Sequence, residues 1–298
     1  MSHRKILKNN SKEVRFMNAQ ANKILCFIVK IQNKLYVIYQ ILISNIFRKK
    51  RKRILFSNHE IWKNSIKRGF KYSEHEISFG DLSKSNLQHY DLVIPLTILD
   101  LEYLAGIGEQ ITKNPIPIPS KECIALCNDK YLFNQKLIDN GFGKYIPKIG
   151  GEHKFPYILK KRIDEWGRNS YIITDHQKET VLSEKLNSSD YFSQEIICDH
   201  CEYATHVLFI NHEIAHSINI EFLFDVERPI KGKDKPVYKR ICNCPFLEFF
   251  AAILTSIEFN GLCCLNYKVV DKTPYIFEIN PRFGGSLNPY FFFLFEIS

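Results

Sequence analysis

The fold is decided by Ile276-Phe277-Glu278-Ile279-Asn280-Pro281-Arg282-Phe283-Gly284-Gly285-Ser286 in the 298-residue sequence. Its first half is an apolar strand with Glu278 and Asn280 two residues apart, so both side chains project from the same face of a sheet. Carboxylate and amide oxygens suit Mg²⁺, and Arg282 can hold a phosphate oxygen. The Gly-Gly-Ser turn lets the backbone approach a ligand closely. The stretch therefore predicts a metal and phosphate site, with an edge strand ending in a Pro/Gly turn as the alternative.

The charges of the chain are divided unevenly along its length. Of 41 Lys and Arg and 32 Asp and Glu, residues 1–53 hold 14 basic residues and one acidic residue, which leaves 27 basic and 31 acidic ones for residues 54–298. The positive net charge of +9 therefore comes from residues 1–53. Because a nucleic-acid-binding surface needs basic residues across the fold, we expect no nucleic acid as a partner.

The nine cysteines favour a reducing environment. An odd number of cysteines without a cleavable signal peptide predicts a cytoplasmic location. Cys198-Asp199-His200-Cys201, Cys242-x-Cys244 and Cys263-Cys264 could together supply zinc ligands. Their spacing does not repeat the CxxC pairing of zinc sites, so buried free thiols are the favoured interpretation.

Residues 1–52 are expected to form an arm ahead of the globular part. Residues 1–22 are polar and basic without a period, which predicts disorder. Residues 24–47 carry apolar side chains at helical spacing, but Lys30 and Lys34 near the middle oppose a bilayer span. Together with the basic run at 48–53, the segment 24–53 predicts a helix lying on an anionic membrane surface, at the inner face of the membrane. An extension of the reading frame or an arm without a function is the alternative.

From residue 53 onward the chain alternates between strand and helix patterns. This alternation predicts an α/β lobe with a small open parallel sheet over residues 53–115, and no GxGxxG motif assigns it a dinucleotide. Three prolines between residues 114 and 119 indicate the boundary to a second domain over residues 116–298. We expect that domain to open with a helical stretch over residues 120–140 and to contain a charged loop over residues 225–239 near the substrate.

The order of the motifs resembles the ATP-grasp superfamily, in particular its carboxylate-amine ligase and carbamoyl-phosphate-synthase-like branch. The most specific piece is the hairpin over residues 261–285. The supporting pieces are Asn128-Asp129-Lys130, a strand that ends on Lys160, and Gln194-Glu195 with Glu202 seven residues later. The resemblance covers residues 53–298 and implies an α/β (α+β) architecture, an ATP-grasp fold preceded by a small open parallel α/β lobe.

The resemblance implies how ATP would be bound. Lys130 and Lys160 would bind its phosphates. The peptide groups of Glu195 and Ile197 would contact the adenine edge, and Glu202 would accept hydrogen bonds from the ribose hydroxyls.

The resemblance also implies a metal site and catalytic cations. Glu278 and Asn280 would hold Mg²⁺, or Mn²⁺, between the β- and γ-phosphates of ATP. Arg282 and Lys160 would be catalytic, because phosphoryl transfer needs charge neutralisation and alignment. Asn266 is expected as a further metal ligand, but it is neutral where related sequences carry an acidic residue or Gln, so one ion or two are both open.

Two other departures from the family pattern bear on activity. Related sequences have a proline after the phosphate-binding lysine and several glycines in the next loop, whereas this chain has Lys161 and Gly167. The chain also ends soon after Ser286 on an apolar run, where relatives continue, which suggests a truncated product.

The activity implied by the resemblance is that of an ATP-dependent ligase that forms a C–N bond. A small-molecule carboxylate would attack the γ-phosphate of MgATP, and an amine would then displace phosphate from the acyl phosphate. A carbamoyl-phosphate-synthase-like or carboxylase reaction is the nearest alternative. A non-catalytic or degenerate nucleotide-binding protein is the alternative from a different class.

Overall fold

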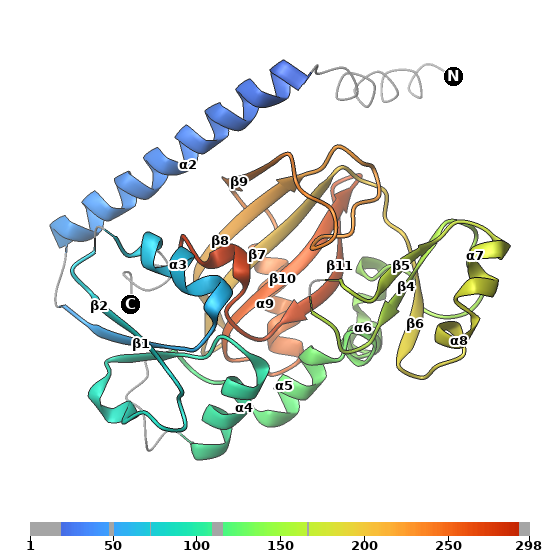
Figure 1. Cartoon of the computed structure of the whole chain (residues 1–298). Helices are drawn as coiled ribbons and strands as arrows, with labels where there is room; N and C mark the ends of the chain where they lie inside the picture. The colour runs from blue at the N-terminus through green and yellow to red at the C-terminus, as the bar shows by residue number, and fades with distance from the viewer. Residues whose placement is uncertain (1–18, 48–50, 72, 109–115, 166, 292–298) are drawn as a thin grey trace.

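The computed structural model of the chain describes residues 19–47, 51–71, 73–108, 116–165 and 167–291 (Figure 1). Residues 1–18 of the arm predicted to be disordered lie outside this range, whereas residues 19–22 belong to helix α2, Ala19–Phe47. The prediction of a helix in the arm is therefore confirmed, with an earlier start. Among the described helices, none is long and apolar enough to span a bilayer.

The first lobe contains a small parallel sheet. Strands β1 (Arg53–Ser57), β2 (Glu76–Gly80) and β3 (Leu92–Ile94) lie in the order β2-β1-β3, and both neighbours of β1 run parallel to it. Helix α3 (Glu60–Gly69) connects β1 to β2, as parallel strands require, a 3-10 helix, Leu87–His89, lies between β2 and β3, and α4 (Ile98–Ile107) follows β3. Thr97 and Asp100 form a capping box at the start of α4, which satisfies the first backbone N–H groups of the helix. The predicted parallel lobe is confirmed.

A second small sheet is antiparallel. It contains β4 (Tyr157–Lys161), β5 (Ser170–Ile173) and β6 (Tyr191–Glu195) in the order β5-β4-β6. Two short helices, α7 (His176–Val181) and α8 (Ser183–Leu186), lie between β5 and β6 in the chain. The predicted strand that ends on Lys160 is therefore present as β4, with β5 and β6 paired on either side of it.

The largest sheet has five antiparallel strands in the order β11-β10-β7-β8-β9. These strands are β7 (Cys201–Ile210), β8 (Glu213–Leu223), β9 (Tyr238–Cys242), β10 (Gly261–Val270) and β11 (Thr273–Asn280). The loop expected over residues 225–239 is shorter than predicted, because Tyr238 and Lys239 already pair with β8.

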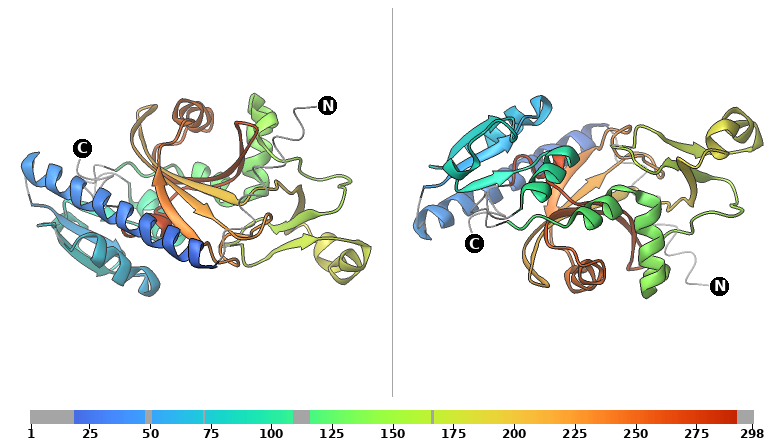
Figure 2. Two further views of the ribbon diagram at one scale, coloured as in Figure 1. Left: turned by 90° about the horizontal axis from the view of Figure 1, so that it is seen from above. Right: turned by 90° about the horizontal axis from the view of Figure 1, so that it is seen from below.

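Each face of the five-stranded sheet is covered by a different part of the chain, as the two views of Figure 2 show. Helices α5 (Lys121–Asn128), α6 (Lys130–Leu137) and α9 (Leu247–Ser256) bury apolar side chains against one face. Residues of β1, α3 and the segment after β11 pack against the other face. Along β10, Cys263 packs toward the helices and Cys264 toward the first lobe, which is the two-residue alternation of a strand buried on both faces.

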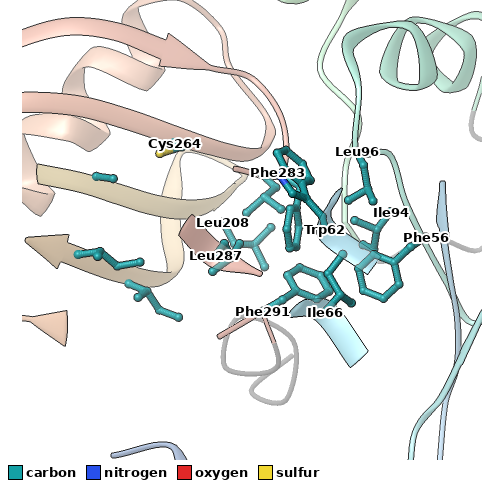
Figure 3. Close-up of a cluster of buried hydrophobic side chains, with 14 of the residues drawn as sticks. Phe56, Trp62, Ile66, Ile94, Leu96, Leu208, Cys264, Phe283, Leu287 and Phe291 are labelled. Carbon is teal, nitrogen blue, oxygen red and sulfur yellow. The ribbon is translucent and has the colours of Figure 1, made fainter. Parts of the chain in front are cut away.

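A cluster of aromatic side chains joins the parallel sheet to the five-stranded sheet (Figure 3). The ring of Phe56 on β1 lies 6.1 Å from the ring of Phe283 and 5.6 Å from that of Phe291. All three side chains are at most 1% exposed. The segment that follows β11 therefore connects the two lobes through a shared core.

The predicted helical stretch over residues 120–140 is present, but it is divided into two helices. Helix α5 ends at Asn128 and α6 begins at Lys130, with Asp129 in an extended conformation between them. The Asp129 carboxylate accepts hydrogen bonds from the N–H groups of Tyr131 and Leu132 at 3.0 and 3.1 Å. An aspartate that caps the next helix competes with continuation of the previous one. A π-helical turn, Ile138–Phe142, follows α6.

Candidate nucleotide-binding site

A cavity of about 350 Å³ opens between the sheet β5-β4-β6 and the five-stranded sheet. Side chains from β4, β6, β10, β11 and the loop before β9 line this central cavity. All nine site residues predicted from the sequence belong to its lining: Lys130, Lys160, Glu195, Ile197, Glu202, Asn266, Glu278, Asn280 and Arg282.

Lys130 is positioned by the break between α5 and α6. Asp129, which caps α6, also receives the guanidinium of Arg162, with Nη2 2.6 Å from Oδ2 and Nε 3.0 Å from the same oxygen. The N–H of Lys130 donates to the carbonyl of Arg162 at 3.0 Å, so the start of α6 is attached to the end of β4. The Lys130 ammonium donates to the carbonyl of Asp164 and lies 3.3 Å from Oε2 of Glu278. The helix break thus brings a cation into the cavity.

Lys160 enters the cavity from β4. Its Nζ donates to Oε1 of the fully buried Gln194 at 2.7 Å and lies 4.9 Å from the ring centre of Phe277. Burial lowers the pKa of Lys160 to about 8, although the Glu278 carboxylate opposes that shift. The ammonium is therefore mostly charged at neutral pH and close to its titration range.

Glu278 is the acidic centre of the site. The register of β10 and β11 places Asn266 opposite Glu278, and Nδ2 of Asn266 donates to Oε1 of Glu278 at 2.9 Å. Nδ2 of Asn280 lies 3.4 Å from the same oxygen. Burial acts to raise the pKa of Glu278, but the charges of Lys130, Lys160 and Lys231 outweigh it, so this pKa lies below its usual value. Glu278 is therefore ionised.

The donor set around Glu278 fits one hard cation. Glu278, Asn266 and Asn280 offer one carboxylate and two amide groups, and Mg²⁺ needs few protein oxygens when phosphates and water complete its shell. Within the described ranges, no group of three or more His, Cys, Asp or Glu that could hold a metal ion is present.

Three lysines of the cavity lining were not predicted as site residues, namely Lys231, Lys239 and Lys268. Nζ of Lys231 donates to Oδ1 of Asn266 and lies 3.6 Å from Oε1 of Glu202. Nζ of Lys268 donates to the carbonyl of Ile197 at 3.0 Å, and this side chain is 2% exposed. Lys268 could have been found from the sequence, because it is two residues beyond Asn266 on the same strand. Lys231 lies in the loop that was expected near the substrate, with no local pattern that separates it from its charged neighbours.

Glu202 is buried next to Lys231 and Lys268. Burial raises the pKa of Glu202, and Lys231 and Lys268 oppose this shift. Burial likewise lowers the pKa of Lys268, and Glu202 opposes that shift. The Glu202 carboxylate can accept further hydrogen bonds from a ligand hydroxyl group.

Arg282 is held away from solvent by three neighbours. Its Nη2 donates to Oε1 of Glu165 at 2.6 Å, and its Nη1 donates to the carbonyl of Phe283 at 3.0 Å. The guanidinium also lies 5.8 Å from the Trp62 ring centre. Its buried Nε has no hydrogen-bond partner in the described part of the chain. Glu165 belongs to the loop between β4 and β5, so a carboxylate from that loop holds the arginine predicted to bind a phosphoryl group.

The two glycines that follow Phe283, Gly284 and Gly285, are required by close packing. A Cβ on Gly284 would lie 2.6 Å from Cε1 of His206, and one on Gly285 would lie 3.1 Å from the Trp62 ring. His206 is fully buried, burial lowers its pKa to about 3, and its Nε2 lies 2.7 Å from Oγ of Ser286. A neutral histidine therefore fixes the Ser286 hydroxyl at the cavity wall.

Comparison with known proteins identifies the fold. No protein-family model and no curated protein sequence matches the chain. Among solved structures, a D-alanine–D-alanine ligase from Bacillus anthracis matches with a TM-score of 0.53 and 14% identity over 80% of this chain and 89% of the other. An L-amino acid ligase from Bacillus licheniformis matches with a TM-score of 0.52 and 14% identity over 82% of this chain and 70% of the other.

A third similar structure contains a nucleotide. This N5-carboxyaminoimidazole synthetase from Staphylococcus aureus, solved with ADP, matches with a TM-score of 0.53 and 13% identity over 80% of this chain and 73% of the other. All three proteins are ATP-grasp ligases. The chain therefore has the ATP-grasp fold that its sequence predicted, preceded by a small parallel α/β lobe.

Proposed function

We propose that the protein is an ATP-dependent ligase that joins a small-molecule carboxylate to an amine through an acyl phosphate. One observation carries the proposal: the cations Lys130, Lys160, Lys231 and Arg282 converge with the ionised Glu278 on one cavity between two sheets. Several cations around one carboxylate match a nucleotide triphosphate with a bound divalent ion. The ligases of similar fold support the same reaction class.

The adenosine half of ATP is assigned to the side of the cavity near β6. The Glu195 N–H donates to the carbonyl of Lys148 at 2.8 Å, and the Ile197 carbonyl accepts from Lys268. We therefore assign the adenine contacts to the Glu195 carbonyl and the Ile197 N–H. Glu202, which is buried on the same side, would accept hydrogen bonds from the ribose hydroxyls.

The phosphates are assigned to the lysines. Lys130 and Lys160 would hold phosphate oxygens, and Lys231 would add a third positive charge beside the neutral Asn266. When bound by Glu278 and Asn280, Mg²⁺ supplies further neutralisation of the β- and γ-phosphates. Arg282 would leave Glu165 and stabilise the phosphoryl group in transfer.

The reaction then needs no protein nucleophile. A carboxylate oxygen of the substrate bonds to the γ-phosphorus as the bond to ADP breaks, and the amine nitrogen then bonds to the acyl carbon as phosphate leaves with the C–O electron pair. The amine loses one proton to solvent or to a base. The chain's residues bind, orient and neutralise charge, which supplies most of the catalysis of phosphoryl transfer.

A non-catalytic nucleotide-binding protein is the second candidate. The observation that favours it is Asn266, which stands where related sequences carry an acidic residue or Gln and whose amide oxygen accepts a hydrogen bond from Lys231. A site with one carboxylate can bind MgATP and still align it poorly for transfer.

Titration calorimetry and ADP release separate the two candidates. We expect MgATP to bind in both cases, but an ATP-dependent ligase releases ADP and phosphate when a panel of carboxylates is supplied with amines. Bicarbonate dependence would indicate the carbamoyl-phosphate or carboxylase variant. Glu278→Gln should abolish turnover, whereas Glu184→Gln on α8 is the matched control. Full turnover by Glu278→Gln would refute the metal assignment, and nucleotide binding without turnover on any acceptor would favour the second candidate.

The division of the chain into residues 1–52, 53–115 and 116–298 is likewise proposed as its functional organisation. The first lobe would supply part of the acceptor pocket, because Trp62 on α3 contacts the turn at Gly285 and lies beside Arg282.

A further inference from the structure

Helix α2 is attached to the edge of the five-stranded sheet along one of its faces (Figure 1). Its Asn33 side chain donates to the carbonyl of Lys239 at 2.8 Å and accepts from the N–H of Ile241 at 3.3 Å. Sγ of Cys26 donates to the carbonyl of Val237 at 2.6 Å, and Val29 on the same face is 3% exposed. Since β9 is the edge strand, these contacts cover backbone groups that would otherwise face solvent. They also fix the rotation of the helix.

The opposite face of α2 is apolar and exposed. At 3.6 residues per turn, seven side chains lie within an arc of about 120° that points away from Asn33. Their exposed fractions range from 38% to 64%. The seven residues of this outer face are Ile24, Phe27, Ile28, Ile31, Leu35, Ile38 and Tyr39. A continuous apolar face of this size on a helix whose other face is already bound to the protein marks an interaction surface.

Positive charge borders the outer face. Lys23, Lys30 and Lys34 are exposed along one side of it, and the sequence continues at 48–53 with six consecutive basic residues. The sequence contains no acidic residue between Glu13 and Glu60. An apolar face bordered by lysines matches the boundary between the acyl chains and the negatively charged headgroups of a bilayer.

We propose that the outer face of α2 docks the protein onto an anionic lipid surface, with the helix lying in the plane of the membrane. A second copy of the chain fits the surface less well. Pairing two outer faces in an antiparallel arrangement would bring the two lysine borders to the same side, and like charges repel each other. Anionic headgroups instead complement the lysines, and the acyl chains accept the apolar side chains.

Docking would also place the candidate active site near the bilayer. Pro236 and Lys239 line the central cavity, and the strand segment that contains Val237 and Lys239 holds α2. The docking proposal stands on α2 and not on nucleotide binding, so either can fail without the other.

The test is co-sedimentation of the full chain with phosphatidylcholine vesicles with and without phosphatidylserine. We expect binding to the vesicles with phosphatidylserine that weakens as salt is raised, because salt screens the lysines. The triple variant Phe27→Ser/Ile31→Ser/Leu35→Ser should lose binding. The variant Lys23→Gln/Lys30→Gln/Lys34→Gln should lower the vesicle partition coefficient about 100-fold, since each lysine near an anionic surface contributes a factor of about five.

A matched control and a fold check complete the design. Gln32→Ser changes an exposed polar side chain of α2 that borders the outer face on the side away from the lysines, and it should leave vesicle binding unchanged. Each variant should keep the melting temperature and ATP affinity of the parent protein, which excludes unfolding as the cause. Equal binding to both kinds of vesicle, binding to neither, or retained binding by the serine variant would overturn the proposal. A dimer in sedimentation equilibrium that the serine variant dissociates, without vesicle binding, would assign the face to a second copy instead.

Discussion

ATP affinity should depend on pH through Lys160. Burial lowers the pKa of this lysine to about 8 in the ligand-free protein, so the side chain loses its charge within an accessible pH range. Phosphate oxygens beside Nζ would stabilise the ammonium and raise this pKa again. Binding of ATP should therefore take up a proton, and affinity should be highest at pH values where the free lysine is already charged.

The size of the effect follows from the pKa. With a pKa of about 8 in the free protein and a higher one in the complex, the dissociation constant for MgATP should rise roughly tenfold between pH 7 and pH 9. At pH 8 about half a proton should be taken up per ATP bound. Isothermal titration calorimetry in two buffers of different ionisation enthalpy measures both quantities.

Two variants separate Lys160 from other titrating groups. Lys160→Met should bind MgATP more weakly at every pH and should not show the tenfold change. Lys161→Met, which alters the next residue of β4 and lies outside the cavity lining, should keep it. A dissociation constant for the parent protein that is constant from pH 7 to pH 9, or a tenfold change that persists in Lys160→Met, would refute the assignment of Lys160 to the phosphates.

Three further predictions test other parts of the structure. Glu165→Gln should increase MgATP affinity by at most about fivefold in calorimetry, because it releases Arg282 from a pair whose carboxylate is 54% exposed and which contributes about 1 kcal/mol or less; weaker binding would contradict the proposed role of Arg282. Asn266→Asp should increase the number of Mn²⁺ ions bound with ATP, measured by electron paramagnetic resonance, because a carboxylate is a stronger ligand than an amide. An unchanged ion count would show that Lys231 or the cavity shape sets the stoichiometry. Phe56→Ala should lower the free energy of unfolding in urea by about 3–5 kcal/mol, since the fully buried ring contacts four other aromatic rings; a loss below about 1 kcal/mol would mean that the cluster in Figure 3 repacks.

Strand patterns in the sequence predicted the central hairpin well. The hairpin predicted within residues 261–285 consists of β10, Gly261–Val270, and β11, Thr273–Asn280. Alternation with a period of two sets which side chains share a face, so Glu278 and Asn280 could be placed together without knowledge of the rest of the fold. The same rule applied to Asn266 would have identified Lys268.

The helix break at Asp129 was missed for a physical reason. Residues 120–140 have apolar side chains compatible with one helical period, and periodicity does not detect a change of axis between two helices. The local signal was an aspartate followed by Tyr131 and Leu132, whose N–H groups it accepts. What makes the break persist is the contact of Asp129 with Arg162, 33 residues away, and no local pattern encodes that contact.

Lys231 is a site residue in a loop that no sequence pattern could identify. The position of its ammonium is set by Asn266 and Glu202, which come from two different strands, so it depends on the assembled sheet. The neutral side chain at 266 and the cation at 231 are therefore two halves of one arrangement. An acidic residue at 266 would attract a second metal ion to the place where Lys231 now supplies positive charge. It follows that the metal count and the position of the loop before β9 should change together, and that Asn266→Asp should also weaken the dependence of ATP binding on Lys231.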